Sequence, residues 1–213
     1  RTARLMLDWK YQTASVGVDA PLISPRTPFS LAEVGTPPLS GAGNLWFWQP
    51  QLRIEQRFSL GDTMGLRLQG ALYETNEIGY MAPTAGTSIE QARPGYEGRF
   101  EFWNHRIGGA RYEIASGFHL SDSHALQNSI PSRVFSVDWL ISPWRKVEWT
   151  GTYFDGENLA GIGGIGPGFN VRYGYDSNSY NGYATPVHST GGWTQLSFLA
   201  TRRLPFNFFA GQQ

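Results

Sequence analysis

The sequence of 213 residues contains no cysteine. That absence excludes a disulfide framework, thiolate metal sites and cysteine nucleophiles. The formal net charge is zero, so the chain lacks the basic excess with which proteins neutralise nucleic-acid phosphates, and we expect no nucleic-acid partner. It also lacks any apolar run close to the ~20 residues of a membrane-spanning helix. Lysine is nearly absent: of the 17 lysine and arginine residues, only Lys10 and Lys146 are lysines.

The two ends of the chain lack the features of a complete secreted protein. The first residue is Arg1 rather than methionine, residues 1–213 contain no segment with the pattern of a signal peptide, and the last residues read FFAGQQ. We therefore expect residues 1–213 to be a fragment of a longer or processed chain that supplies part of a single domain.

Glycine and aromatic residues, in contrast, are abundant. The chain has 26 glycines, and 15% of its residues are aromatic. Two classes of protein combine such a composition with modest hydrophobicity. One is a soluble, aromatic-rich β-sandwich. The other is an outer-membrane β-barrel, whose spanning strands alternate between apolar and polar residues and so average to a mildly hydrophilic profile.

Apolar and charged residues alternate along the chain with the two-residue period of β-strands. In the segment QLRIEQRF (51–58), for example, the apolar residues alternate with Arg53, Glu55 and Arg57. Helical periodicity is not convincing anywhere. The alternation predicts about ten strands, most of them near the ~9–11 residues that a tilted strand needs to cross a bilayer. The predicted strands are 4–10, 13–18, 51–58, 64–73, 96–103, 110–120, 135–141, 146–153, 193–201 and 206–210.

The links between these strands alternate strictly between short and long. The short links lie near Tyr11 and at 59–63, 104–109, 142–145 and 202–205. The long links are 20–44, 75–93, 121–132 and 155–192. In an up-and-down barrel successive links fall on opposite rims, so this order puts the short turns on one rim and the long loops on the other. The sequence therefore predicts an all-β fold, an antiparallel up-and-down transmembrane β-barrel, with residues 1–213 forming part of one barrel domain.

The charged face of the predicted strands is expected to line the lumen. An arginine on the lipid face near the bilayer midplane costs about 2–4 kcal/mol. Turning the arginines of these strands toward lipid would therefore cost on the order of ten to twenty kcal/mol, more than the whole stability of a typical domain. The predicted pore-lining residues are Arg4, Asp8, Arg53, Glu55, Arg57, Arg67, Glu97, Arg99, Glu101, Arg111, Glu113, Asp138 and Glu148. The positive and negative charges of these residues are nearly balanced, so they indicate no preference between anions and cations.

Tryptophan and tyrosine residues gather near the ends of predicted strands. Such residues form girdles at the two interfaces of membrane barrels. The predicted girdle residues are Trp9, Trp46, Trp48, Tyr96, Trp144 and Tyr153.

Any single strand of this pattern suits a half-buried soluble sheet equally well. The alternative is thus a secreted, soluble, aromatic-rich β-domain that binds or acts on carbohydrate.

Two of the long links have distinctive compositions. The link 20–44 is rich in proline, which stiffens it. Such a loop can stay outside the barrel or fold into it and narrow it, and among the long links we expect this one to supply a constriction. The residues predicted to form this constriction are Pro21, Ser24, Pro25, Arg26 and Pro28. The link 155–192 is rich in glycine and is expected to be an outer loop that covers or shapes the channel entrance.

Several short motifs resemble the DcaP-type family of outer-membrane porins. The run LISPRTPFSL (22–31), then Gly43-Asn44 and PQLR (50–53), is similar to the loop and following strand of that family. The chain differs in lacking an aromatic residue shortly after Gly17. Further similar motifs are Ser132-Arg133, SPWR (142–145), Asn158-Leu159, PVHS (186–189) and GGW (191–193). The resemblance implies a bacterial outer-membrane location, a homotrimeric barrel and passive uptake of small hydrophilic solutes.

Other chemistry is less well supported by the sequence. His119 and His124 have no regular metal-ligand spacing, so we expect no metal site. Glu97 and Glu101 resemble a glycosidase pair, but Arg99 lies between them, which favours charge neutralisation. The glycines at 161, 163 and 166 match a dinucleotide signature without the strand and helix that it requires. The sequence therefore predicts a porin, in contact with the lipid bilayer and with small hydrophilic solutes or ions, and neither enzymatic activity nor a cofactor.

Overall fold

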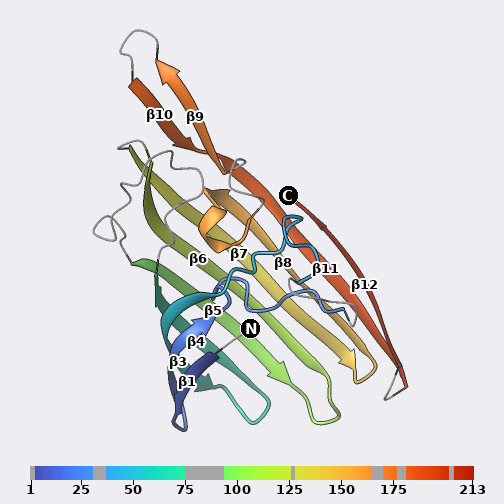
Figure 1. The fold of residues 1–213 in the computed structure, drawn as a ribbon. Helices are drawn as coiled ribbons and strands as arrows, with labels where there is room; N and C mark the ends of the chain where they lie inside the picture. Colours follow the sequence, from blue (N-terminus) through green and yellow to red (C-terminus); the bar gives the residue numbers. More distant parts are fainter. Residues whose placement is uncertain are drawn as a thin grey trace.

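The computed structural model describes residues 3–30, 37–74, 94–125, 128–164, 170–176, 181–201 and 204–213. Ten strands form one antiparallel sheet in the order β1-β2-β3-β4-β5-β6-β7-β8-β11-β12 (Figure 1). The predicted all-β, antiparallel architecture is confirmed. The bounds of these strands are β1 Ala3–Asp8, β2 Gln12–Asp19, β3 Gln49–Ser59, β4 Met64–Tyr73, β5 Gly95–His105, β6 Arg111–Ala125, β7 Asn128–Trp144, β8 Val147–Glu157, β11 His188–Thr201 and β12 Leu204–Gln212.

The connections separate the two rims of the sheet. Tight turns join β1 to β2, β3 to β4, β5 to β6 and β7 to β8, along the lower rim in Figure 1. The long segments that join β2 to β3 and β8 to β11 start from the opposite rim. The predicted long link 75–93 lies outside the described residues. The described helical structure is a short 3-10 helix, η2 (Ala160–Ile162), and no helix in the described ranges is long and apolar enough to cross a membrane.

One predicted long link is wrong. The segment 121–132 was expected to be a loop, but β6 and β7 continue to pair along it until Ala125 lies opposite Asn128. The physical reason is that backbone hydrogen bonds do not require an alternating sequence. The β6 residues of this segment, 121–125, are mostly polar, so their pattern does not indicate a strand, although they stay in register with β7 as far as Ala125 and Asn128.

The predicted Gly-rich loop 155–192 contains more regular structure than its sequence indicates. β8 extends to Glu157, and β11 already begins at His188. Between them, β9 (Val171–Asp176) and β10 (Asn181–Pro186) form a separate antiparallel hairpin, which projects beyond the sheet in Figure 1. Val171 and Ala184 of this hairpin pack on Ile130 of β7. Tyr173 packs against the same cluster, and burial raises the pKa of its phenol.

The sheet separates apolar from charged side chains. Directly opposed residues of antiparallel strands point to the same side of a sheet, so the strand register assigns each side chain to a face. One row across the first six strands reads Leu5, Val16, Leu52, Leu72, Tyr96 and Leu120. Each of these six residues is at least 43% exposed. The apolar face, as we call it, is therefore largely uncovered in this chain.

The opposite face, which we call the charged face, is covered by the segment between β2 and β3. Figure 1 shows this segment crossing the concave side of the sheet toward β11 and β12. Gly43 lies against the backbone carbonyls of Gly192 and Gln212. A side chain at position 43 would collide with these carbonyls, and its φ of +93° also favours glycine.

A small apolar core lies between the covering segment and the sheet. Ile23 and Leu45 of the segment pack with Val134 of β7 and Phe154 of β8, and Leu159 and Ile162 complete the cluster. The segment is thus packed onto the charged face through apolar side chains as well as through the polar contacts described below.

The sheet is open in the described part of the chain. β1 and β12 are its two outer strands, and no pairing between them is present in the described ranges. The architecture is therefore a curved, ten-stranded antiparallel sheet, and the closure expected of a barrel is not observed in it.

Candidate functional site

The candidate site is the charged face and the segment packed on it. Every residue predicted to line a pore lies on this face, because the register connects them in rows that alternate with the apolar rows. Their burial differs widely. Glu97, Arg99, Glu101 and Asp138 are buried, whereas Arg4, Asp8 and Arg111 are exposed, and the remaining residues are half-buried.

A buried ion-pair network occupies the centre of the charged face. Arg99 of β5 donates from Nε to Asp138 Oδ2 and from Nη2 to Asp138 Oδ1, both at 2.8 Å. Its Nη2 also lies 2.6 Å from Glu101 Oε2. The side chains of Arg99, Glu101 and Asp138 are each at most 2% exposed. This paired and bidentate geometry offsets the cost of burying the charges.

Two further arginines bring the network into charge balance. Arg67 of β4 places Nη1 3.0 Å from Glu101 Oε1. Arg26, from the covering segment, forms ion pairs with Glu113 and Asp138 and lies 4.0 Å from Glu101. Three guanidinium groups thus meet three carboxylates. Because one of the three arginines belongs to the segment between β2 and β3, the network also holds that segment on the sheet.

A second polar contact fixes the segment a few residues earlier. The backbone N–H of Leu22 donates to Glu97 of β5. The other oxygen of Glu97 lies 2.9 Å from Nδ1 of His119 on β6, and the Tyr73 hydroxyl on β4 lies 2.6 Å from Nε2 of the same imidazole. Tyr73, Glu97 and His119 are all buried. The group therefore joins three strands and the segment without contact to bulk solvent.

Neutral polar side chains make the remaining contacts between the segment and the sheet. Gln195 of β11 accepts a hydrogen bond from the Phe29 N–H at 2.7 Å. Ser136 of β7 donates to the Ile23 carbonyl at 2.9 Å. On β3, Gln51 donates to the Asp19 carbonyl at 2.7 Å. Side chains of the sheet thus bind backbone groups of the segment at several points along residues 20–29.

The residues predicted to form a constriction lie within this segment, but they do not all face the same surroundings. Pro21, Ser24 and Pro28 are buried, Arg26 is half-buried in the ion-pair network, and Pro25 is exposed. The segment therefore presents Pro25 to solvent on the concave side, whereas its other predicted residues anchor it.

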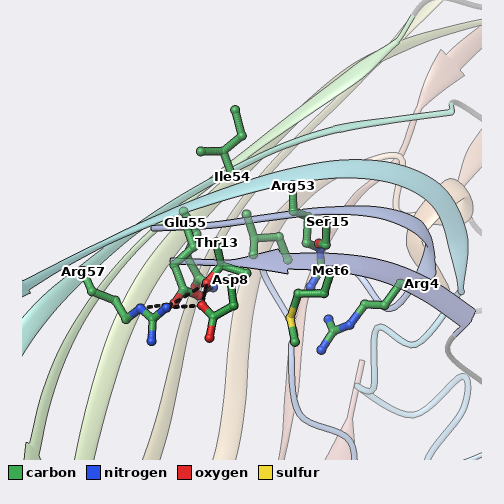
Figure 2. Close-up of a pocket in the computed structure, with 11 residues that line it drawn as sticks. Arg4, Met6, Asp8, Thr13, Ser15, Arg53, Ile54, Glu55 and Arg57 are labelled. Carbon is green, nitrogen blue, oxygen red and sulfur yellow. Dashed lines mark hydrogen bonds and ion pairs between the residues drawn. The ribbon is translucent and has the colours of Figure 1, made fainter. Parts of the chain in front are cut away.

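The charges near the outer strands are more accessible. Arg4 and Arg53 both pair with Asp19, and Arg57 pairs with Asp8. Together with residues of β2 and β4 they line a cavity of about 250 Å³, shown in Figure 2. At the rim that carries the tight turns, Arg111 pairs with Glu148. The two side chains are 45% and 35% exposed.

The predicted girdle residues occupy two kinds of position. Trp9, Tyr96, Trp144 and Tyr153 are exposed, at 47% or more. Trp46 and Trp48 are instead half-buried in the segment that precedes β3, where Trp46 contacts both Phe47 and Trp48. Phe47 lies next to η2, because its N–H donates to the Ile162 carbonyl.

Some residues of the site did not follow from the sequence. Asp19, Gln51, Tyr73, His119 and Gln195 all contact the segment or its anchors. In the sequence, Tyr73 and His119 alternate with the apolar residues of their strands and so share a face with the charged residues. The sequence carries no other signal for these two residues. No cluster of three or more histidine, cysteine or acidic side chains that could hold a metal ion occurs in the part of the chain that the structure describes.

Comparisons of this chain with protein-family models, with curated proteins and with solved structures found no match. The geometry of the charged face and the apolar face therefore carries the functional argument.

Replacing Arg26 with glutamine is expected to loosen the covering segment, because it leaves Asp138 and Glu113 without one of their cationic partners. Hydrogen exchange measured by mass spectrometry should become faster at Leu22 and Ile23 by about tenfold or more, as expected when local opening becomes easier. The matched control is Arg145→Gln, at an exposed turn position. Equal exchange rates in the two variants would mean that the ion pairs of Arg26 do not hold the segment.

Proposed function

We propose that this chain forms part of an outer-membrane porin through which small hydrophilic solutes or ions diffuse passively. The observation that supports this most is the division of one large antiparallel sheet into an exposed apolar face and a charged face. In this arrangement the apolar face contacts lipid, and the charged face lines an aqueous lumen.

The exposed apolar face is difficult to reconcile with a soluble monomer. Soluble proteins rarely expose continuous apolar patches larger than a few hundred Å². Here exposed leucine, isoleucine and aromatic residues follow one another in register across the strands, such as Leu68 opposite Phe100 and Phe118 opposite Phe135. A lipid environment removes this surface from water without a protein partner.

The segment between β2 and β3 would then narrow the lumen. Its contacts with Glu97, Asp138 and Gln195 hold it against the concave side of the sheet. Diffusion past it would depend on the width that remains and on the accessible charges around it. A sheet of this kind must also be closed in a bilayer, because unpaired strand edges are too costly in lipid. We therefore propose that it belongs to a closed barrel, and that the barrels assemble as a homotrimer in the bacterial outer membrane.

Reconstitution of the full-length protein in a planar lipid bilayer tests this function. We expect stepwise increases in ionic conductance as single barrels insert, and no such steps with heat-denatured protein at the same concentration. The sign of the reversal potential in a salt gradient then reports the ion selectivity.

A correctly folded protein that inserts without conductance would contradict the porin proposal. A full-length protein that stays monodisperse in buffer without detergent would contradict it as well, and would favour a secreted carbohydrate-binding domain. Size-exclusion chromatography before and after detergent removal measures the second outcome, on the same preparation that is used for the conductance recordings.

A further inference from the structure

The cavity near the outer strands has ends of opposite charge. It is open to solvent, has a volume of about 250 Å³ and is lined by residues of β1, β2, β3 and β4 and by Leu22 of the covering segment. Figure 2 shows Arg4 at one end, with Arg57, Asp8 and Thr13 gathered at the other. Met6 lies between the two ends on β1.

The end near Arg4 is positive. Arg4 and Arg53 share the carboxylate of Asp19, and Arg53 also interacts with the buried Glu97, so Arg4 is the accessible cation at this end. The Arg4 side chain is 42% exposed and gives only its Nη1 group to Asp19. Because the side chain is accessible to solvent, its other N–H groups can bind a carboxylate.

The end near Asp8 is negative. Asp8 and Glu55 both pair with Arg57, and Glu55 also pairs with Arg67. Among the described residues Asp8 therefore has one cationic partner, Arg57, which it shares with Glu55. The Asp8 side chain is 58% exposed. Its Oδ1 accepts hydrogen bonds from Arg57 and Thr13, so Oδ2 is without a hydrogen-bond partner within the described residues. A primary ammonium group has the charge and the donors to bind there.

The distance between the two ends selects the kind of solute. Arg4 and Asp8 are four residues apart on one strand and lie on the same face, so their Cα atoms are about 13 Å apart. An extended peptide covers about 3.3–3.6 Å per residue, so about three residues, with the reach of the two side chains, bridge this distance. A free amino acid is too short, and a dianion of this length would place its second negative group beside Asp8.

We propose that this cavity is a binding site for short zwitterionic peptides of about three residues, with the carboxylate at Arg4 and Arg53 and the ammonium group at Asp8 and Glu55. The inference rests on the proposed porin function and names a class of solute for it. The peptide would bind along β1 in the lumen before it passes the covering segment.

Uptake into liposomes that contain the full-length protein tests this site. The probes are trialanine, which has both charged ends, N-acetyl-trialanine, which has only the carboxylate, and trialanine amide, which has only the ammonium group. Mass spectrometry of the washed liposomes measures the amount that enters. We expect trialanine to enter about threefold faster or more than either capped peptide, since each accessible ion pair contributes up to about 1 kcal/mol.

Two variants assign the ends of the site. Arg4→Gln should reduce the discrimination against trialanine amide, because the carboxylate partner is lost. Asp8→Asn should reduce the discrimination against N-acetyl-trialanine instead. Arg106→Gln, at an exposed turn position outside the cavity, is the matched control and should keep the preference of the unmodified protein.

Conductance recorded on the same preparation separates the two proposals. If the protein conducts ions but the three peptides enter at equal rates, the peptide site is overturned and the porin function stands. If the preference for trialanine persists in both Arg4→Gln and Asp8→Asn, the site lies elsewhere and the inference is also overturned. Absence of conductance in a folded, inserted protein overturns the porin function and this inference with it.

Discussion

Replacing Leu68 with arginine is expected to lower the free energy of unfolding in lipid vesicles by about 2–4 kcal/mol. Leu68 lies in the middle of β4, on the apolar face, and is 47% exposed. If this face contacts lipid, the new guanidinium group must be desolvated or must distort the bilayer. If the face contacts water, the same substitution should change the stability by no more than about 0.5 kcal/mol.

Urea titration followed by tryptophan fluorescence measures this difference. The matched control is Ile107→Arg, in the turn between β5 and β6, where the residue is 96% exposed. The control substitution makes the same chemical change at a position beyond the strands and should be nearly neutral. Equal effects of the two substitutions would contradict a lipid-facing role for the apolar face.

Replacing Arg99 with methionine is expected to destabilise the protein by about 3–5 kcal/mol, because two buried carboxylates lose one of their partners and one buried negative charge is no longer compensated. Asp138 loses two hydrogen bonds of 2.8 Å, and Glu101 loses its closest cation. Arg99→Lys should have an intermediate effect, since lysine keeps the positive charge but cannot donate to both oxygens of Asp138 in the same fork geometry.

The control for this prediction is Arg111→Met, in the accessible ion pair with Glu148. Such exposed pairs contribute at most about 1 kcal/mol. The free energies of unfolding of the three variants, measured by the same urea titration, should therefore rank Arg99→Met below Arg99→Lys and both below Arg111→Met. A loss at Arg99 as small as that at Arg111 would mean that the central network is hydrated in solution.

The strand positions and their faces could be predicted well from the sequence. Residues 64–73 were predicted as a strand and form β4 with the same bounds. The reason is local: on a strand, successive side chains point to opposite sides, so an alternating sequence states which residues share a face. Where both faces are polar, as in residues 121–125, the same signal is absent, and the outer part of β6 was missed.

The candidate site was only partly predictable. The alternation places Arg99 and Arg111 on one face with equal weight, yet the side chain of Arg99 is 2% exposed and that of Arg111 is 45% exposed. Burial depends on the segment between β2 and β3, which covers the middle of the charged face and leaves its margins open. The position of that segment depends on contacts between residues more than 70 positions apart, such as Leu22 with Glu97, and no local pattern encodes such contacts.

The sequence by itself determined the strand period, the separation of apolar from charged residues and the order of short turns, because each depends on neighbouring residues. Only the tertiary structure decided which charges are buried together, where Arg26 is held, and that Arg4 and Asp8 remain accessible at the two ends of one cavity. These properties arise when strands and loops far apart in the chain meet, since burial and ion pairing depend on distances in space rather than on spacing in the sequence.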